Sequence, residues 1–156
     1  MSRLTATAQG ERDILVTRRF DAPRDKVWRA LTEPALMRQW MTSSYGALKS
    51  LEGDTVVGGQ QHFAWEGEDE DLVMTVTYDA LEPPELIRHR ESWPQHSAMD
   101  SSVETRLIDA GNTTEMRMTI TFASAEAREQ ALGFGMADGM EAMYATLDDH
   151  LASHAA

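Results

Sequence analysis

The hydrophobic positions of this chain follow two different periods, which separate a region of strands from a region of helix. Between residues 44 and 122, apolar residues recur at every second position, most clearly in the runs 72–78 and 116–122. Such alternation is typical of an antiparallel sheet with one covered face and one wet face. Turn signals such as Gly58-Gly59 interrupt the alternation. The region therefore predicts six strands.

The residues before this region predict one more strand and two short helices. The run 14–20 begins with β-branched and apolar residues and is typical of a strand. Pro23 favours the start of a helix, because the N–H that proline lacks would have no partner in the first turn. Pro34 ends that helix and opens a second one. The apolar residues that share a helical face are Val27, Trp28 and Leu31 in the first helix and Leu36, Met37 and Trp40 in the second.

The C-terminal part of the chain carries apolar residues at helical spacing. Ser124 is a favourable N-cap, and we expect one long helix from Ser124 to Ser153, about 45 Å long at 1.5 Å per residue. Gly133, Gly135 and Gly139 each disfavour a helix by about 1 kcal/mol relative to alanine, so they predict a bend or a close approach to the backbone. The apolar stripe consists of Leu132, Met136, Met140, Met143, Leu147 and Leu151.

This order of elements predicts an α+β fold with one domain over residues 12–153. A curved sheet cannot close around a filled core by itself, so we expect a seven-stranded antiparallel sheet to wrap around the long C-terminal helix. The two short helices would then cover one end. We expect residues 1–11 to form a flexible N-terminal arm.

Composition narrows the range of partners. The chain has 156 residues, with 14 Lys plus Arg against 26 Asp plus Glu, a net charge of −12. Such a chain repels phosphate, so nucleic acid and anionic membrane surfaces are excluded as expected partners. There is no cysteine, which excludes disulfides and thiolate metal sites. No apolar run approaches the roughly 20 residues that a membrane helix needs, and we expect a cytoplasmic protein.

Several residues, taken in order, resemble a known superfamily. They are Phe20-Asp21-Ala22-Pro23, Val27-Trp28, Trp40, Gly58-Gly59, Pro83-Pro84 and a last helix that contains Gly139. The chain is similar to the START-like (SRPBCC) superfamily and, within it, to the family named after the C-terminal domain of the activator of the heat-shock-protein-90 ATPase. The resemblance covers about residues 12–153. It implies a helix-grip fold with a cavity between sheet and helix, where family members bind or transform hydrophobic small molecules.

The methionine-rich helical stripe is the main candidate for a binding surface. Methionine is unbranched and polarizable, so it adapts to apolar ligands of varied shape. Plain core packing is the alternative reading of the stripe and of the aromatic residues. The candidate ligand-binding residues are Trp40, Tyr45, Phe63, Trp65, Met74, Tyr78, His89, Trp93, Met118, Met136, Met140 and Met143.

His89 and Glu91 are candidates for acid–base chemistry. They alternate with Arg88 and Arg90, so they share one strand face and would meet in a pocket if that face points inward. The alternatives are that both side chains are solvated or that they only anchor the polar end of a ligand. The sequence leaves open which face of the strand at 86–93 lines a cavity. The same holds for the strand at 61–65, where Gln61, Phe63 and Trp65 share one face and His62 and Ala64 share the other.

Other chemistry has little support in the sequence. His150 and His154 lie four residues apart, but the five histidines show no compact ligand spacing, and the acidic run 66–71 lacks a calcium-loop pattern. No nucleophile elbow, P-loop or dinucleotide-binding motif is present. We therefore expect no metal and no cofactor.

Three functional hypotheses remain open. The first is a binding protein for a small hydrophobic molecule such as a lipid or polyketide. The second is a cyclase- or hydrolase-like enzyme that uses His89 and Glu91. The third is a chaperone-linked interaction module, and a homodimer is also left open because exposed sheet edges can pair.

Overall fold

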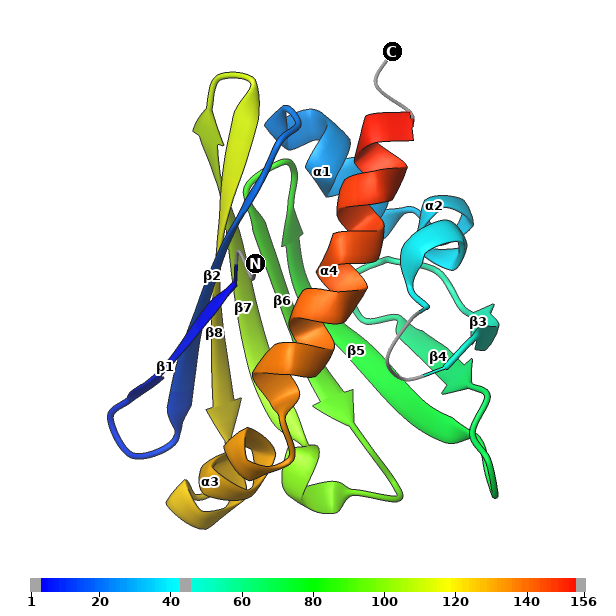
Figure 1. Cartoon of the computed structure of the whole chain (residues 1–156), viewed down its shortest axis with the longest axis vertical. Coiled ribbons are helices and arrows are strands. Elements are labelled where there is room, and N and C mark those ends of the chain that lie inside the picture. Colours follow the sequence, from blue (N-terminus) through cyan, green and yellow to red (C-terminus); the bar gives the residue numbers. More distant parts are fainter. Residues whose placement is uncertain (1–3, 43–45, 154–156) are drawn as a thin grey trace.

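One antiparallel sheet and a helix laid across its concave face make up the fold (Figure 1). The computed structural model describes residues 4–42 and 46–153. The strands lie in the order β1-β2-β8-β7-β6-β5-β4-β3. Their bounds are β1 Thr5–Gln9, β2 Asp13–Phe20, β3 Leu48–Glu52, β4 Gln60–Trp65, β5 Leu72–Glu82, β6 Leu86–Ser92, β7 Ser101–Ala110 and β8 Thr113–Phe122.

The helices cover the concave face and its two ends. The long helix α4 crosses the sheet, α1 and α2 pack beside its C-terminal half, and α3 lies beyond its N-terminus (Figure 1). A short 3₁₀ helix, η1, joins β6 to β7 and contacts α3. The bounds are α1 Arg24–Thr32, α2 Pro34–Trp40, η1 Ser97–Met99, α3 Ala125–Gly133 and α4 Met136–Ser153. The predicted α+β helix-grip architecture is confirmed.

The sheet has eight strands, so the predicted seven is wrong by one. The additional strand, β1, lies within the segment that the sequence assigned to a flexible arm. It pairs with β2 from Thr5↔Thr17 to Gln9↔Asp13 and turns at Gly10, whose φ is +55°. The strand is mostly exposed and has no large apolar residue, so the hydrophobic pattern carried no signal for it.

The predicted single C-terminal helix is in fact two helices. Ser124 caps the first one as expected, with its side chain accepting a 3.0 Å hydrogen bond from the Ala127 N–H. The chain then breaks at Phe134-Gly135, where Gly135 has a φ of +78°. Glycine adopts this left-handed conformation without the steric penalty of a Cβ. The break redirects the chain from α3 into α4.

Gly135 and Gly133 form a matched pair for testing this break. A Cβ at either position would meet nothing within 4 Å, but only Gly135 has a positive φ. We expect Gly135→Ala to lower the free energy of unfolding by about 1–2 kcal/mol through backbone strain. Gly133→Ala should leave it unchanged or raise it by up to about 1 kcal/mol. Urea unfolding measures both, and equal effects would contradict the assignment of the break to Gly135.

A buried arginine fixes α4 to the sheet. Arg18 points inward from β2 and is 2% exposed. Its guanidinium donates to Glu141 at 3.0 and 2.9 Å and to Asp148 at 3.0 and 2.8 Å, both on α4. Burial alone would lower the pKa of Arg18, but hydrogen bonds to Asp148 and Glu141 and the charges of both carboxylates raise it above its usual value. The arginine therefore stays charged, and it also lies 5.0 Å from the ring centre of Phe20.

Removing this arginine should loosen α4. We expect Arg18→Met to lower the free energy of unfolding by about 3 kcal/mol, the lower end for a broken buried pair, because Glu141 and Asp148 keep partial contact with water. The control is Arg19→Met, whose side chain is 66% exposed and should cost less than about 0.5 kcal/mol. Equal losses in urea unfolding would show that the contact does not anchor the helix.

Candidate functional site

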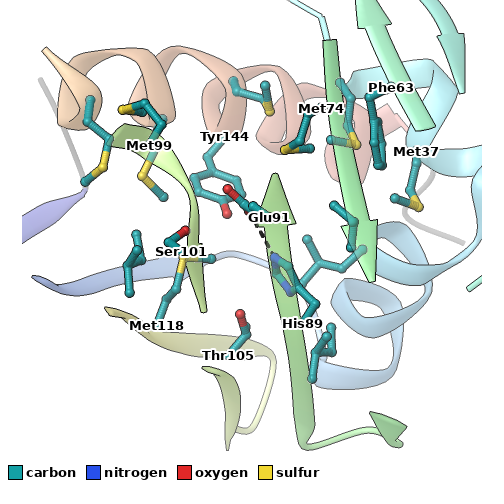
Figure 2. Close-up of a pocket in the computed structure, with 18 of the residues that line it drawn as sticks. Met37, Phe63, Met74, His89, Glu91, Met99, Ser101, Thr105, Met118 and Tyr144 are labelled. Atoms are coloured by element: carbon teal, nitrogen blue, oxygen red, sulfur yellow. Dashed lines mark hydrogen bonds and ion pairs between the residues drawn. The ribbon is translucent and has the colours of Figure 1, made fainter. Parts of the chain in front are cut away.

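A cavity of about 170 Å³ lies between the concave face of the sheet and α4. Its lining comes from β4 to β8, from the start and middle of α4, and from the region of α2 and η1 (Figure 2). Two clusters of buried apolar residues surround it, one centred on β2, β8 and α4 and the other on β4, β5 and β6. The cavity is smaller than the roughly 300–1,000 Å³ usual for drug-sized ligands.

The structure brings the sequence-predicted residues together around this one space. Tyr45 lies outside the described residues. Every other candidate lines the cavity, although binding by them stays a prediction. They are Trp40, Phe63, Trp65, Met74, Tyr78, His89, Trp93, Met118, Met136, Met140 and Met143.

The two strand faces left open by the sequence are now assigned. On β4, Phe63 and Trp65 line the cavity, while His62 lies on the outer face, with its Nδ1 3.1 Å from the Thr75 hydroxyl. On β6, the face with His89 and Glu91 points inward. The pairing of β5 with β6 shifts register at a bulge between Tyr78 and Ala80, next to the pair Tyr78↔His89. The solvated-surface alternative for the His89–Glu91 pair is therefore wrong.

All nine methionines beyond Met1 line the cavity. The sequence-based candidates include five of them, whereas Met37, Met41, Met99 and Met116 were not among the candidates. The five are Met74 on β5, Met118 on β8, and Met136, Met140 and Met143 on α4. The period-two spacing to Met118 could have found Met116, and the helical spacing to Trp40 could have found Met37. Met99 belongs to η1, for which no periodic signal exists.

An aromatic wall closes one side of the cavity. Phe63 and Trp65 stack with centroids 5.7 Å apart, and Trp65 stacks on Trp93 at 6.1 Å. The Trp65 indole N–H donates to the Met41 carbonyl at 2.9 Å, and that of Trp40 donates to the Ala30 carbonyl at 2.8 Å. These two N–H groups are satisfied by the protein, so the wall offers a ligand apolar ring surface.

The polar residues of the lining gather on the neighbouring strands β6 and β7. His89 Nε2 lies 3.0 Å from Glu91 Oε2, and Glu91 Oε1 accepts a 3.3 Å hydrogen bond from the Trp93 indole. Ser101 pairs directly opposite Glu91 in the sheet, and Thr105 also lines the cavity. Figure 2 shows these four polar side chains around the same space. We call His89, Glu91, Ser101 and Thr105 the polar corner.

The imidazole of His89 has no nitrogen open to a ligand. Its Nε2 is engaged by Glu91, and its Nδ1 is buried without a hydrogen-bond partner. A general acid or base must reach the reacting proton directly or through one water. This geometry therefore leaves Glu91, Ser101 and Thr105 as the groups that can meet a bound molecule.

A buried network seals the cavity at Tyr78. The Tyr78 hydroxyl donates to Gln61 Oε1 at 2.6 Å, and Gln61 Nε2 donates to the Thr55 hydroxyl at 2.8 Å. Burial, together with the nearby charge of Glu91, raises the pKa of Tyr78 to about 12. Its hydroxyl is therefore a fixed donor to the protein rather than a proton source at neutral pH.

The raised pKa predicts a loss of stability in alkali. The unfolded chain releases the tyrosine proton near pH 10, two units earlier than the folded chain. The contribution is therefore complete below pH 10 and is lost as the pH rises to 12, by about 3 kcal/mol. Tyr78→Phe should remove this part of the pH dependence of unfolding in urea. An unchanged slope between pH 10 and 12 would contradict the assignment to Tyr78.

A second hollow of about 450 Å³ adjoins the cavity beside η1 and the α3–α4 break. It shares three lining residues with the cavity, Trp93, Met99 and Met136. Phe134, 68% exposed, and Gly135 form part of its rim. The break in the C-terminal helix therefore lies where this hollow meets the cavity wall.

The described residues contain neither a metal-binding cluster nor a membrane-spanning helix. Within 4–42 and 46–153, no group of three or more His, Asp or Glu side chains is arranged to hold a metal ion. His154 lies outside that range. In the same part of the chain, no helix is long and apolar enough to cross a membrane.

Solved structures share this architecture over nearly the whole chain. A protein from Rhodobacter sphaeroides is 26% identical, covers 96% of this chain and 99% of its own, and superposes with a TM-score of 0.88. A protein from Nitrosomonas europaea matches at 16% identity and a TM-score of 0.81, over 94% of this chain and 98% of that chain. A protein from Staphylococcus epidermidis is 21% identical, has a TM-score of 0.81, and covers 94% of this chain and 93% of its own. No curated protein matches the chain.

The sheet, the gripped helix and these neighbours define a START-like protein of the SRPBCC type. A family model described as "Activator of Hsp90 ATPase homolog 1-like protein" matches residues 21–152. The chain therefore belongs to that family, as the sequence resemblance implied.

Proposed function

We propose that this protein binds a small, mainly apolar molecule in the cavity between the sheet and α4. The observation that carries the proposal is a cavity of about 170 Å³ that all nine methionines beyond Met1 line. Protein interiors are otherwise packed as densely as organic crystals. The methionine side chains would adapt their shape to the molecule that enters.

The energetic cost of the cavity argues against plain core packing. Side chains that border a cavity lose the van der Waals contacts that a close-packed core would give them. A core shaped for stability alone would fill this space, whereas a bound ligand restores the missing contacts.

The cavity volume favours a molecule with one ring. An apolar cavity of about 150 Å³ in another protein binds benzene, and this one is slightly larger. A longer molecule such as a lipid or polyketide would extend through the shared wall at Trp93, Met99 and Met136 into the adjoining hollow. Binding is favoured over catalysis because neither nitrogen of His89 is free to exchange a proton with a ligand.

Filling the cavity tests the proposal. Met118 points inward from β8 and is 8% exposed, so Met118→Trp should occupy much of the space. With the methionine methyl groups labelled with ¹³C, we expect ethylbenzene to shift their resonances in the wild type and to bind at least tenfold more weakly to the variant. The control is Val57→Trp, at a side chain 61% exposed, which should bind as the wild type does.

The methyl spectrum also reports whether each variant is folded. If Met118→Trp does not fold, Met140→Phe on α4 repeats the test with a smaller increase in volume. Unchanged ethylbenzene binding in a folded, filled variant would contradict a site in this cavity. So would the absence of any methyl shift in the wild type.

A further inference from the structure

The cavity is apolar on most sides and polar at one place, and the polar place has a definite charge. Among residues 4–42 and 46–153, no lysine or arginine lines the cavity, whereas the Glu91 carboxylate does. The other members of the polar corner are His89, Ser101 and Thr105. The lining therefore holds a negative group without the fixed cation that a carboxylate or phosphate ligand would need as a partner.

Glu91 is held in place with room left to accept from a ligand. One oxygen faces His89 Nε2 at 3.0 Å, and the other accepts from the Trp93 indole at 3.3 Å. Each carboxylate oxygen has two lone pairs, so both oxygens can accept one more hydrogen bond. The side chain is 25% exposed even though its neighbours are apolar, in keeping with its place in the cavity lining.

The hydroxyl of Ser101 can complete the recognition of a small polar group beside Glu91. Ser101 lies directly opposite Glu91 in the β6–β7 register, whereas Thr105 lies opposite Ile87, four residues further along β6. Ser101 also lines the cavity. A hydroxyl can both donate and accept. A ligand hydroxyl would therefore donate to Glu91 and accept from Ser101.

We propose that the cavity selects an uncharged molecule of one-ring size that carries a hydroxyl group, as in an alkylphenol, and rejects a carboxylate of the same size. The inference rests on the proposed function and adds its specificity. The apolar ring would lie among the methionines and the Phe63–Trp65–Trp93 wall, with its hydroxyl at the polar corner. An anionic ligand would bury its charge beside Glu91 with no cation to pair with it, which burial makes unfavourable.

Four probes of similar size separate shape from polarity. They are 4-ethylphenol, ethylbenzene, 4-methylbenzoate and 4-methylbenzylamine, titrated at pH 7 against the full chain labelled with ¹³C at its methionine methyls. We expect 4-ethylphenol to bind about tenfold or more tightly than ethylbenzene, which is the usual gain for a hydrogen bond to a charged group. The benzoate should bind at least 100-fold more weakly than the phenol. The amine should also bind more weakly than the phenol, because its pairing with Glu91 would not offset the free energy that the ammonium loses when it leaves water.

A change at Glu91 tests whether this residue sets the selectivity. Glu91→Gln keeps the size and an acceptor oxygen but removes the charge. We expect it to tighten 4-methylbenzoate binding at least tenfold, with little change for ethylbenzene. The matched control is Glu115→Gln, which removes one negative charge from a side chain 40% exposed on β8, outside the cavity lining. It should leave all four affinities as in the wild type.

The outcomes separate this inference from the proposed function. If none of the four probes shifts the methionine methyls, the cavity is not a binding site and both proposals fail. If ethylbenzene binds but the benzoate or the amine binds as tightly as the phenol, the cavity is a binding site and the selectivity proposed here is wrong. Equal effects of Glu91→Gln and Glu115→Gln on benzoate binding would likewise overturn the role of Glu91.

Discussion

The ion pairs that Arg18 makes with Glu141 and Asp148 on α4 are the constraint on which the rest of the structure depends. They join the inner face of β2 to Glu141 and Asp148 through four short hydrogen bonds. Tyr144, between them on the helix, packs edge-on against Phe20 with centroids 5.6 Å apart. One side of α4 is thus tied to the sheet, while Met136, Met140 and Met143 face the space over β5 to β8. Because the helix is held from one side, the other side can stay open without collapse.

The cavity combines an adaptable lining with one fixed polar feature. Methionine side chains have several rotatable bonds and set few demands on ligand shape. The polar corner is rigid by comparison, because Glu91 is held from two sides and sits within the central pairing of β6 with β7. A site of this kind would select by polarity more than by shape. That division fits a fold that holds many different sites on one framework.

Much of the site could be predicted from the sequence, because strand periodicity assigns side chains to faces before any contact is known. Met118 and Tyr78 were found in this way, and the helical stripe supplied Met140. The unknown strand register limited the prediction at β6, because a shift of one residue would have turned His89 away from the cavity. Arg18 was missed as an inward residue because its carboxylate partners lie more than 120 positions away. A buried arginine is expected at a core position only when its carboxylate partners are known.

Other parts of the structure left no trace in the hydrophobic pattern. The edge strand β1 is held by backbone pairing with β2, which polar residues provide as well as apolar ones. The break in the C-terminal helix was foreshadowed by three glycines, but the sequence does not tell which one adopts a positive φ. Ser101 follows an irregular connection through η1, so its place opposite Glu91 depends on the β6–β7 register alone.

Xenon binding tests the central claim most directly, because xenon occupies apolar cavities without needing hydrogen bonds. A crystal of the protein pressurised with xenon should show xenon in the cavity between the sheet and α4, among the methionines of β5, β8 and α4. The surrounding backbone should be unchanged. A structure in which these methionines fill the space and no xenon enters would contradict the account.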